Sequence, residues 1–267
     1  MTIVENDAGE APGPDLTRDA FLGGRVMVLQ PARRGHRAGF DAVMLAASLP
    51  EGATGTVADL GAGVGVAGLC LAARLAVDVV FVERDSETFD LLRRNLAANA
   101  GIGGRFTAIR ADVTAKGAER AAAGLTAGLA DHVVMNPPFH PAERGRPSPD
   151  AARAEAHRAA EGDLDAWVRA AASILAPSGT LTLIHRADAI AAVIEALGRR
   201  FGAIDLLPLH ARAGAPAHRL IARARLGSRG PLALLQGLVV HNADGAYRPE
   251  VDAVLRGGAA LAAGWRR

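Results

Sequence analysis

Two hydrophobic periodicities alternate along the middle of the chain. Short apolar runs rich in valine alternate with longer segments in which apolar residues recur three or four positions apart, the patterns of buried strands and amphipathic helices. The short runs predict strands over 57–60, 77–82, 106–110, 132–135 and 180–185. The longer segments predict helices over 66–76, 86–100, 118–129, 165–175 and 189–201. Apolar strands that alternate with helices indicate a parallel sheet covered on both faces.

The pattern changes towards both ends of the chain. Before the alternation, "GGRVMVLQP" predicts a short strand and "AVMLAASL" a helix that Asp41 is placed to cap. After Phe201, "AIDLLPLH" and "HRLIARARL" predict two strands joined by a Gly/Pro turn, hence an antiparallel pair. "LVVHNADGAY" predicts one more strand and a turn ahead of a final alanine-rich helix. We therefore expect an α/β fold with a mostly parallel seven-stranded sheet, helices on both faces and an antiparallel C-terminal strand pair.

The length of the chain suits one domain with a substantial core. The opening segment, "MTIVENDAGEAPGPD", is acidic and rich in glycine and proline, so we expect a disordered tail over 1–20. Residues 21–267 are then expected to form a single domain. Within it, 21–50 is a lead-in and 226–267 a C-terminal extension of strand and helix.

The composition of the chain limits the cellular compartments and the binding partners that can be expected. The formal net charge is +2 and the pI is 9.3, a mildly basic balance that permits nucleic-acid binding. Cys70 is the only cysteine and lies in an apolar helical run, so we expect a core residue, no disulfide and no thiolate metal site. Apolar stretches are interrupted before they could span a bilayer, and the start lacks the pattern of a signal peptide. We expect a cytoplasmic protein without metal or membrane; a monomer is assumed, the oligomeric state being open.

Candidate ligand-binding residues directly follow the predicted strands. The first strand runs into "DLGAGVG", where Gly61, Gly63 and Gly65 allow a tight turn and close approach to a ligand, and the next helix directs free N–H groups there. Glu83 ends the second strand about 20 residues later, the spacing at which a carboxylate accepts hydrogen bonds from ribose hydroxyls. The third strand ends at Asp112 and the fourth in "NPPF".

Two cofactors are compatible with the glycines and Glu83. Residues 63–68, "GVGVAG", match the G-x-G-x-x-G pattern of NAD-binding folds. However, Asp59 lies in the strand just before the glycines, where a buried carboxylate is unfavourable beside a pyrophosphate but favourable beside the ammonium group of an amino acid. NAD also leaves "NPPF" unexplained. The combination favours S-adenosylmethionine (AdoMet), which carries an amino acid at one end and an adenosine at the other.

These motifs together resemble a known class of enzyme. "DLGAGVG", "VERDS", "AD" and "NPPF", in this order and spacing, are similar to the motifs of class I AdoMet-dependent methyltransferases that methylate amines. "GFDAVMLAASLP", "PAHRLIARARL" and "LVVHNADGAYRPEVDAVLR" resemble segments of the bacterial tRNA(Val) adenine-N6-methyltransferases, and the similarity extends from about Phe21 to Arg256. The resemblance implies a Rossmann-like class I methyltransferase fold, AdoMet as the cofactor and tRNA as the partner.

The resemblance also implies a role for each residue at the strand ends. The residues implied to hold AdoMet are Asp59, Gly61, Gly63 and Gly65 for its methionine part, Glu83 for its ribose and Asp112 for its adenine amine. Those implied to act on the substrate are Asn136 and Pro137, which would hold the target amine, and Phe139, which would stack on the target base. Further expected substrate contacts are Pro138, His140, Arg144 and Arg146.

An amide followed by proline suits methyl transfer to an exocyclic amine. The lone pair of such an amine is delocalised into its ring, which makes it a poor nucleophile. The side-chain oxygen of Asn136 and the carbonyl of Pro137 can each accept one N–H, which turns the lone pair towards the methyl donor and stabilises developing positive charge. Adenine N6, guanine N2 in ribosomal RNA and a protein glutamine amide all present such an amine, so the last two are alternative substrates. An NAD-binding or non-catalytic Rossmann module is the alternative from another class.

Basic residues gather in the loops expected at the ligand edge of the sheet, which favours contact with an RNA backbone. They are Arg33, Arg34, His36, Arg37, Arg144, Arg146, Arg153, His157, Arg158, Arg212, His218 and Arg219. His132 and His185, by contrast, fall in predicted strands, where we expect structural histidines with hydrogen-bond partners.

Overall fold

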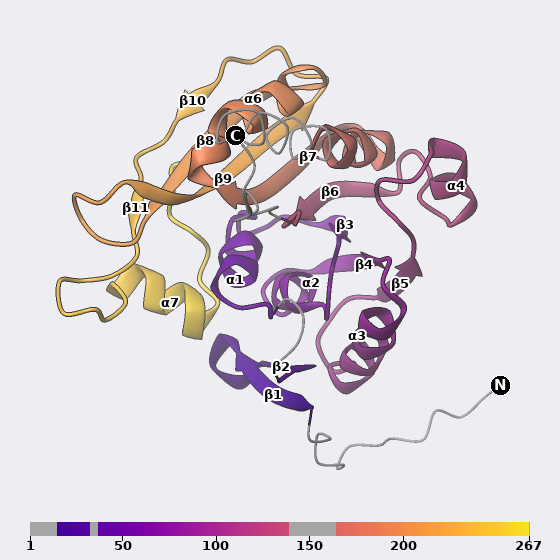
Figure 1. Ribbon diagram of the computed structural model, residues 1–267, viewed down its shortest axis with the longest axis horizontal. Coiled ribbons are helices and arrows are strands. Elements are labelled where there is room, and N and C mark those ends of the chain that lie inside the picture. The colour runs from indigo at the N-terminus through magenta and orange to yellow at the C-terminus, as the bar shows by residue number, and fades with distance from the viewer. Residues whose placement is uncertain (1–14, 33–36, 139–163, 267) are drawn as a thin grey trace, which may run out of the picture.

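The computed structural model describes residues 15–32, 37–138 and 164–266, which form an α/β fold around one large sheet (Figure 1). Seven strands build the sheet, in the spatial order β8 (Phe201–His210), β9 (Ala217–Leu226), β7 (Leu175–Arg186), β6 (Ala130–Met135), β3 (Gly55–Leu60), β4 (Val77–Glu83) and β5 (Phe106–Arg110). The short strands β10 (Ala233–Leu234) and β11 (Leu238–Val239) pair with β8 at one edge.

The direction of the strands confirms the predicted fold class. β7, β6, β3, β4 and β5 run parallel to one another. β9 is antiparallel to both β7 and β8, which makes the predicted C-terminal antiparallel pair. β10 and β11 bring the sheet to nine strands: β11 lies in the strand expected at "LVVHNADGAY", whereas β10, with two residues, is too short to produce a periodic pattern.

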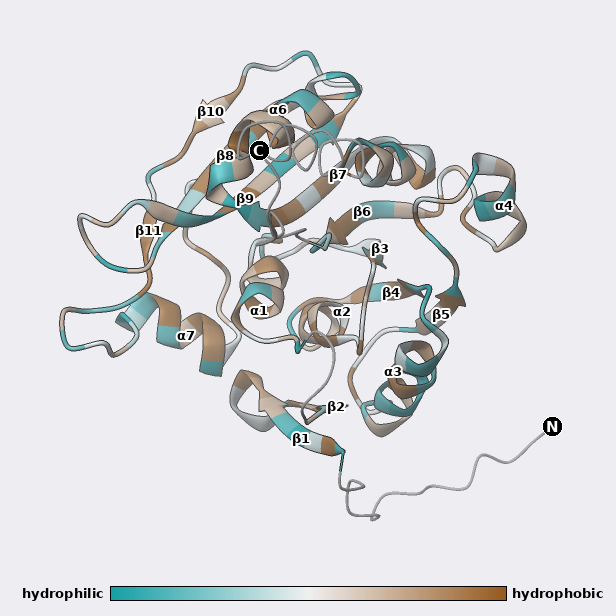
Figure 2. Cartoon of the chain, viewed as in Figure 1, coloured by the Kyte–Doolittle hydropathy of each residue, from teal (hydrophilic) through white to brown (hydrophobic). Residues whose placement is uncertain are grey.

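Side chains of the central strands point alternately into two hydrophobic cores, one on each face of the sheet. Phe81 belongs to the first core and its neighbours Val80 and Val82 to the second. Figures 1 and 2 show the first face covered by α1 (Phe40–Ala47), α2 (Val66–Ala72), α3 (Ser86–Ala98) and α7 (Pro249–Gly257), and the second by α6 (Ile190–Gly198) and a helical segment at 164–174. The remaining helix, α4 (Gly117–Ala122), connects β5 to β6.

Some predicted helix ends are wrong. α2 ends at Ala72 instead of residue 76, because the chain turns at once into β4 at Val77. α4 ends at Ala122 instead of residue 129, since Gly124 has a φ of +102° and stops the helix. Gly258, with a φ of +70°, ends α7 in the same way, so the alanine-rich stretch after it is not helical. None of the helices in the described ranges is long and apolar enough to cross a bilayer.

A hairpin precedes the sheet, where residues up to 20 were expected to belong to a disordered tail. β1 (Leu16–Phe21) pairs antiparallel with β2 (Val26–Pro31), so the expectation is wrong for residues 16–20. Residues 1–14 lie outside the described ranges. β1 has too few apolar residues for its sequence to predict a strand. Polar contacts compensate for this: Asp19 accepts hydrogen bonds from Gln30 at 2.8 Å and Arg37 at 2.6 Å.

Two asparagines, Asn95 in α3 and Asn99 directly after it, bond to β2 where a neighbouring strand would otherwise pair. Asn95 accepts from the backbone N–H of Leu29 (2.8 Å) and donates to its carbonyl (3.0 Å). Asn99 bonds in the same way to Met27, at 3.1 and 2.7 Å. Asn95 also donates to the carbonyl of Val64 at 3.0 Å. The hairpin is therefore tied to the loop that follows β3.

Candidate active site

Residues predicted to bind ligands meet at one edge of the sheet. Leu60 of β3 pairs in register with Val82 of β4 and Met135 of β6. The residues that follow these positions therefore lie at the same level: the glycine loop (residues 61–65), Glu83 and Asn136. This is the carboxyl edge of the parallel strands, where open α/β sheets bind ligands.

The three glycines of the glycine loop have different surroundings. Gly61, Gly63 and Gly65 all have positive φ, at +68°, +56° and +96°. A Cβ atom on Gly61 would lie 2.5 Å from the ring of Trp167, and one on Gly65 would lie 2.7 Å from Leu92. A Cβ on Gly63 would meet no atom of the described structure within 4 Å. The loop therefore faces open space at Gly63, and a ligand can approach its backbone there.

Asp59 is a buried carboxyl group directly behind the glycine loop. It is 2% exposed, and its Oδ2 accepts a hydrogen bond from the backbone N–H of Gly68 at 2.9 Å. Burial raises the pKa of Asp59 to about 7; the Gly68 hydrogen bond opposes this rise, and the charge of Glu83 adds to it. A cationic ligand group beside Asp59 would offset the cost of ionising it in a buried place. The site is thus suited to an ammonium group.

Glu83 is hydrogen-bonded to the glycine loop. Its Oε2 accepts from the backbone N–H of Gly63 at 3.0 Å. Its Oε1 accepts from the N–H groups of Arg84 and Asp85, at 2.8 and 2.9 Å. These bonds hold the half-buried carboxylate at the end of β4. Oε2, which accepts only one of these bonds, keeps a further lone pair with which to accept from a hydroxyl group.

Asp112 lies in the loop after β5. Its Oδ1 accepts from both the backbone N–H and the hydroxyl of Thr114 at 2.7 Å, and its Oδ2 lies 3.3 Å from Arg84 Nη1. Burial opposes ionisation, but the hydrogen bonds from Thr114 and Arg84 outweigh it, so the pKa of Asp112 is below its usual value. Asp112 is therefore an anionic acceptor near neutral pH.

β6 ends in a polar amide followed by two prolines. Pro137 is buried and Pro138 is exposed. The Oδ1 atom of Asn136 is buried and has no hydrogen-bond partner among the described residues. Leaving a buried acceptor unsatisfied costs about 1–3 kcal/mol. Within the described part of the chain, this oxygen is left for another donor, such as an N–H group of a ligand.

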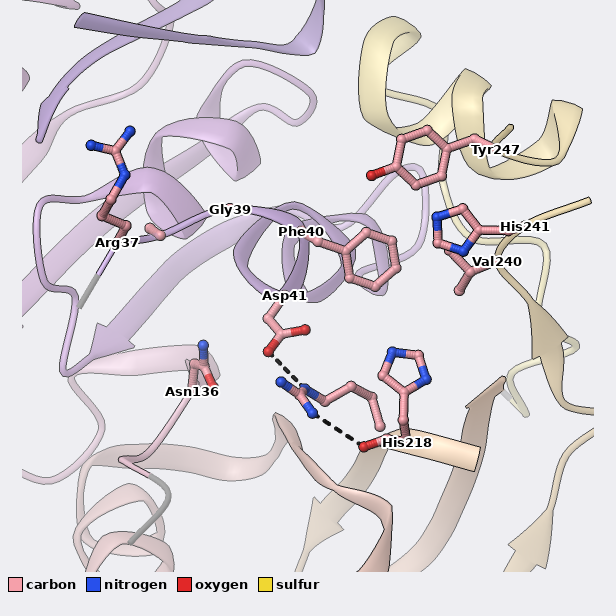
Figure 3. A pocket seen from close by; sticks show the side chains of 11 residues that line it. Arg37, Gly39, Phe40, Asp41, Asn136, His218, Val240, His241 and Tyr247 are labelled. Atoms are coloured by element: carbon pink, nitrogen blue, oxygen red, sulfur yellow. Dashed lines mark hydrogen bonds and ion pairs between the residues drawn. The ribbon is translucent and has the colours of Figure 1, made fainter. Parts of the chain in front are cut away.

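Asn136 also lines a cavity of about 430 Å³, which we call the Asn136 cavity (Figure 3). Its volume falls within the usual range of ligand sites. Its walls come from the start of α1, the end of β6, the start of β9 and the segment after β11. The lining residues are Arg37, Ala38, Gly39, Phe40, Asp41, Asn136, His218, Arg219, Val240, His241 and Tyr247.

An ion pair holds one wall of the Asn136 cavity. Asp41 Oδ2 accepts from Arg219 Nε at 2.8 Å, and Arg219 Nη1 donates to the carbonyl of His218 at 3.2 Å. The prediction that Asp41 caps α1 is wrong: the N-cap is Gly39, no side chain caps the helix, and Asp41 lies in its first turn. The carboxylate is directed to a guanidinium far along the chain instead of to its own helix.

Arg37, one of the basic residues expected to contact RNA, is bonded to the N-terminal hairpin. Its guanidinium donates to Asp19 at 2.6 Å, and to Thr17 and the carbonyl of Pro31 at 2.8 Å each. These bonds position the segment that leads into α1 and into the wall of the Asn136 cavity. His218 and Arg212 are exposed. Their contact with RNA stays a prediction.

Other predicted site residues lie outside the described ranges. They are Arg33, Arg34, His36, Phe139, His140, Arg144, Arg146, Arg153, His157 and Arg158. His132 and Cys70 are structural, as predicted: His132 Nδ1 lies 2.7 Å from Thr180 Oγ1, and Cys70 is fully buried. Burial lowers the pKa of His132 and raises the pKa of Cys70 to about 12. In the described part of the chain, no three His, Cys, Asp or Glu side chains are grouped as metal ligands.

Four aromatic residues at the site were not identified from the sequence. Trp167, in the helical segment 164–174, covers Gly61. Phe40, His241 and Tyr247 line the Asn136 cavity. The available signal was "HNADGAY", in which turn-forming residues separate two rings and can bring them together. The position of Phe40 gave no such signal, because its neighbours come from the other end of the chain.

The sheet order and the glycine loop after β3 define the fold of a class I AdoMet-dependent methyltransferase. The chain belongs to the methyltransferase small domain family, which it matches over residues 38–212. The class of enzyme predicted from the motifs, a class I AdoMet-dependent methyltransferase, is thereby confirmed.

Relatives with an assigned activity support this membership. The tRNA1(Val) (adenine(37)-N6)-methyltransferase of Aeromonas hydrophila is 32% identical over 216 residues, which are 79% of this chain and 85% of the relative. The enzyme of the same name from Shewanella sediminis is 30% identical over 144 residues, 54% of this chain. The match spans only 57% of that relative, and 58% of the one from Tolumonas auensis.

Solved structures show the same fold. A predicted O-methyltransferase from Agrobacterium tumefaciens is 34% identical with a TM-score of 0.71, covering 83% of this chain and 98% of the other. The 16S rRNA N2 G1207 methyltransferase of Thermus thermophilus, solved with AdoMet and guanosine, is 23% identical with a TM-score of 0.50. That match covers 79% of this chain and 50% of the other. At this identity the likeness is one of fold.

Proposed function

We propose that the protein is an AdoMet-dependent methyltransferase that modifies the N6 amine of an adenine in tRNA. The observation that carries the proposal is the buried Oδ1 of Asn136, which has no hydrogen-bond partner among the described residues and lies at the ligand edge of a methyltransferase fold. It lies beside a cavity large enough for a ligand and can accept a hydrogen bond from an amine.

The residues around the glycine loop fit AdoMet. The open space at Gly63 admits a ligand against the backbone, and the buried Asp59 would hold the ammonium group of its methionine part. Glu83 would accept from the ribose hydroxyls and Asp112 from the adenine amine. AdoMet, when bound, supplies an electrophilic methyl group on a sulfonium centre. Gly61 and Gly65 let the loop pass close to Trp167 and Leu92 and so shape the site.

Asn136 and Pro137 would orient the amine that receives the methyl group. Asn136 Oδ1 accepts one N–H of the amine and the carbonyl of Pro137 accepts the other. The nitrogen lone pair is thereby directed away from these two acceptors and towards the cofactor side of the edge. As methyl transfer places positive charge on the nitrogen, both acceptors stabilise it without having to reorganise. Phe139 would stack on the target base.

The choice of adenine in tRNA is supported by the relatives. The Aeromonas hydrophila protein, named for adenine 37 of tRNA1(Val), aligns with 79% of this chain. His218, which lines the Asn136 cavity, and Arg212 are both exposed and are compatible with contact to an RNA backbone. Guanine N2 and a glutamine amide could donate to the same acceptors, so the test must distinguish the three products.

The test is to incubate unmodified tRNA with the protein and labelled AdoMet, and to digest the RNA to nucleosides. We expect label in N6-methyladenosine, incorporated on the order of 100-fold more slowly when Asn136 is replaced by alanine. A parallel reaction with ribosomal RNA and a protein extract tests the two alternative substrates, guanine N2 and a glutamine amide, under the same conditions. Label in N2-methylguanosine or in protein, with none in tRNA adenine, would refute the proposed substrate but leave the methyltransferase assignment intact.

We expect the pKa of Asp59 to make both stability and cofactor binding depend on pH. The folded-state pKa, about 7, lies above the ordinary value of 3.8. Between these values the folded protein keeps a proton that the unfolded chain has released, so stability should fall as pH rises through this window. AdoMet binding should show the opposite trend and strengthen as pH rises through 7, because the ammonium group favours ionised Asp59.

Asp59→Asn separates the two effects. At about pH 8 this variant should be at least as stable as the wild type and should lose the pH dependence, since it buries no charge. Its AdoMet affinity should nevertheless be at least about 10-fold lower, the worth of one charge-assisted hydrogen bond. Thermal unfolding across the pH range and calorimetric titration with AdoMet measure the two quantities. Parallel stability profiles for wild type and variant would show that Asp59 does not titrate near neutral pH.

A further inference from the structure

The end of the Asn136 cavity away from Asn136 is built from three aromatic side chains, Phe40, His241 and Tyr247, which we call the ring cluster (Figure 3). The rings of Phe40 and Tyr247 are nearly parallel, at 6°, with centroids 6.4 Å apart. Those of His241 and Tyr247 are inclined by 24° with centroids 4.9 Å apart. Tyr247 is 40% exposed although it lies beside a cavity. A set of similarly oriented rings therefore presents aromatic surface to a ligand.

The backbone holds the ring cluster in place before any ligand binds. His241 and Tyr247 form an isolated antiparallel bridge, closed by a turn in which the N–H of Asn242 donates to the carbonyl of Ala246 at 2.8 Å. His241 Nδ1 lies 3.1 Å from the carbonyl of Ala211. These contacts fix two of the rings relative to β8 and β9. Little conformational entropy remains to be lost when a flat ligand stacks there.

The ring cluster and Asn136 lie at different ends of one cavity. Figure 3 shows Asp41 between Asn136 and Phe40, with His218 below Phe40 and His241. Asp41 is paired with Arg219, so this part of the wall is polar, and the negative charge of Asp41 is balanced by the positive charge of Arg219. A base whose amine is bound at Asn136 leaves the rings at the other end available for a second flat group.

We propose that the ring cluster binds the base of a nucleotide adjacent to the target nucleotide. The inference rests on the proposed function, because it requires an RNA substrate. Every nucleobase has a flat π-face, and stacking on protein aromatic rings is the usual way in which unpaired bases are held. A second base held in this way keeps the target nucleotide out of its own stack, since the neighbour is no longer available as a stacking partner. His218, exposed beside the cavity, is placed to contact the phosphate that links the two nucleotides.

The experiment uses the full chain and unmodified tRNA1(Val) transcripts with 2-aminopurine on the 5′ or the 3′ side of adenine 37. Fluorescence of this base is quenched when it stacks on an aromatic ring. We expect binding of the wild-type protein to change the fluorescence at one of the two positions. Tyr247→Ala should abolish that change and raise the Kd for tRNA by roughly 5- to 100-fold, with AdoMet affinity unchanged. Tyr247→Phe, which keeps the ring, should behave like the wild type.

Two further measurements connect the effect to the base itself. Removing the base at the responsive position should weaken tRNA binding by the wild type but add no further loss to Tyr247→Ala. Leu234→Ala, which truncates a side chain that is 64% exposed on the edge strand β10, controls for loss of surface area and should change nothing. Methylation of adenine 37 without any fluorescence change, and with equal Kd for wild type and Tyr247→Ala, would overturn the inference and leave the proposed function standing. Absence of tRNA methylation and binding by the wild type would instead overturn the proposed function, and the inference with it.

Discussion

Asn136→Ala should lower the rate of methyl transfer by about 10²- to 10³-fold, the loss observed when one preorganised hydrogen-bonding group is removed from a transition state. The buried Oδ1 accepts no hydrogen bond from the described residues, so its acceptor capacity is available for substrate. Its position at the end of β6, followed by the buried Pro137, holds the amide in place. Truncation therefore removes a fixed acceptor, and the free amine of the substrate gains no replacement in the same geometry.

The effect of Asn136→Ala should appear in the rate and not in cofactor binding. Single-turnover rates with saturating AdoMet and tRNA measure the first, and calorimetric titration with AdoMet measures the second. Asn136→Asp keeps an acceptor oxygen in place and should retain more activity than Asn136→Ala. Leu234→Ala, an exposed position on β10 that does not line the Asn136 cavity, is the control and should retain full activity. Turnover of Asn136→Ala close to that of the wild type would show that the amide has no catalytic role.

The ligand edge of the sheet was predictable because its residues directly follow strong strand patterns. Glu83 and Asn136 come next to apolar runs in the sequence, and parallel pairing of those runs brings their ends together. The glycine loop was equally accessible, since positive φ at consecutive turn positions favours glycine strongly. At these positions the neighbouring residues in the sequence favour the conformation that the fold requires, so the sequence was sufficient to predict them.

The Asn136 cavity was not predictable, because its walls come from segments that lie far apart in the sequence. Residues 37–41 and 240–247 meet only after the sheet has formed. Asp41 illustrates the limitation: an aspartate ahead of a helix favours capping on local grounds, yet its partner is Arg219. β1 illustrates it again, because it is held by its pairing with β2 and by hydrogen bonds from Gln30 and Arg37 to Asp19. The structure at such positions depends on residues far away in the sequence, and the hydrophobic periodicity of the chain carries no information about those partners.

The glycine loop provides the second large effect, because Gly61 and Gly63 share a backbone conformation but differ in surroundings. Gly61→Ala should destabilise the protein by about 2–5 kcal/mol, the sum of left-handed backbone strain and overpacking. The overpacking arises from the new Cβ, which would lie 2.5 Å from the Trp167 ring. Gly63→Ala should cost only the backbone strain, about 1–2 kcal/mol, since its Cβ would meet no described atom within 4 Å. Chemical denaturation of the protein without cofactor measures both costs.

Cofactor binding should reverse the order of the two variants when each is measured under conditions where it is folded. If the open space at Gly63 is where AdoMet lies against the backbone, Gly63→Ala should weaken AdoMet binding by on the order of 100-fold, because the methyl group occupies the ligand's position. Gly52→Ala is the matched control: Gly52 has a φ of +85° and open surroundings, but it precedes β3 at the opposite end of the strand. It should share the strain of Gly63→Ala and leave AdoMet affinity unchanged. Equal AdoMet affinities for Gly63→Ala and Gly52→Ala would place the cofactor away from the glycine loop, because a ligand that does not touch Gly63 is unaffected by the added methyl group.

The overpacking at Gly61 can be tested separately. Combining Gly61→Ala with Trp167→Leu should recover part of the stability lost in Gly61→Ala, because the ring that the new Cβ meets has been removed.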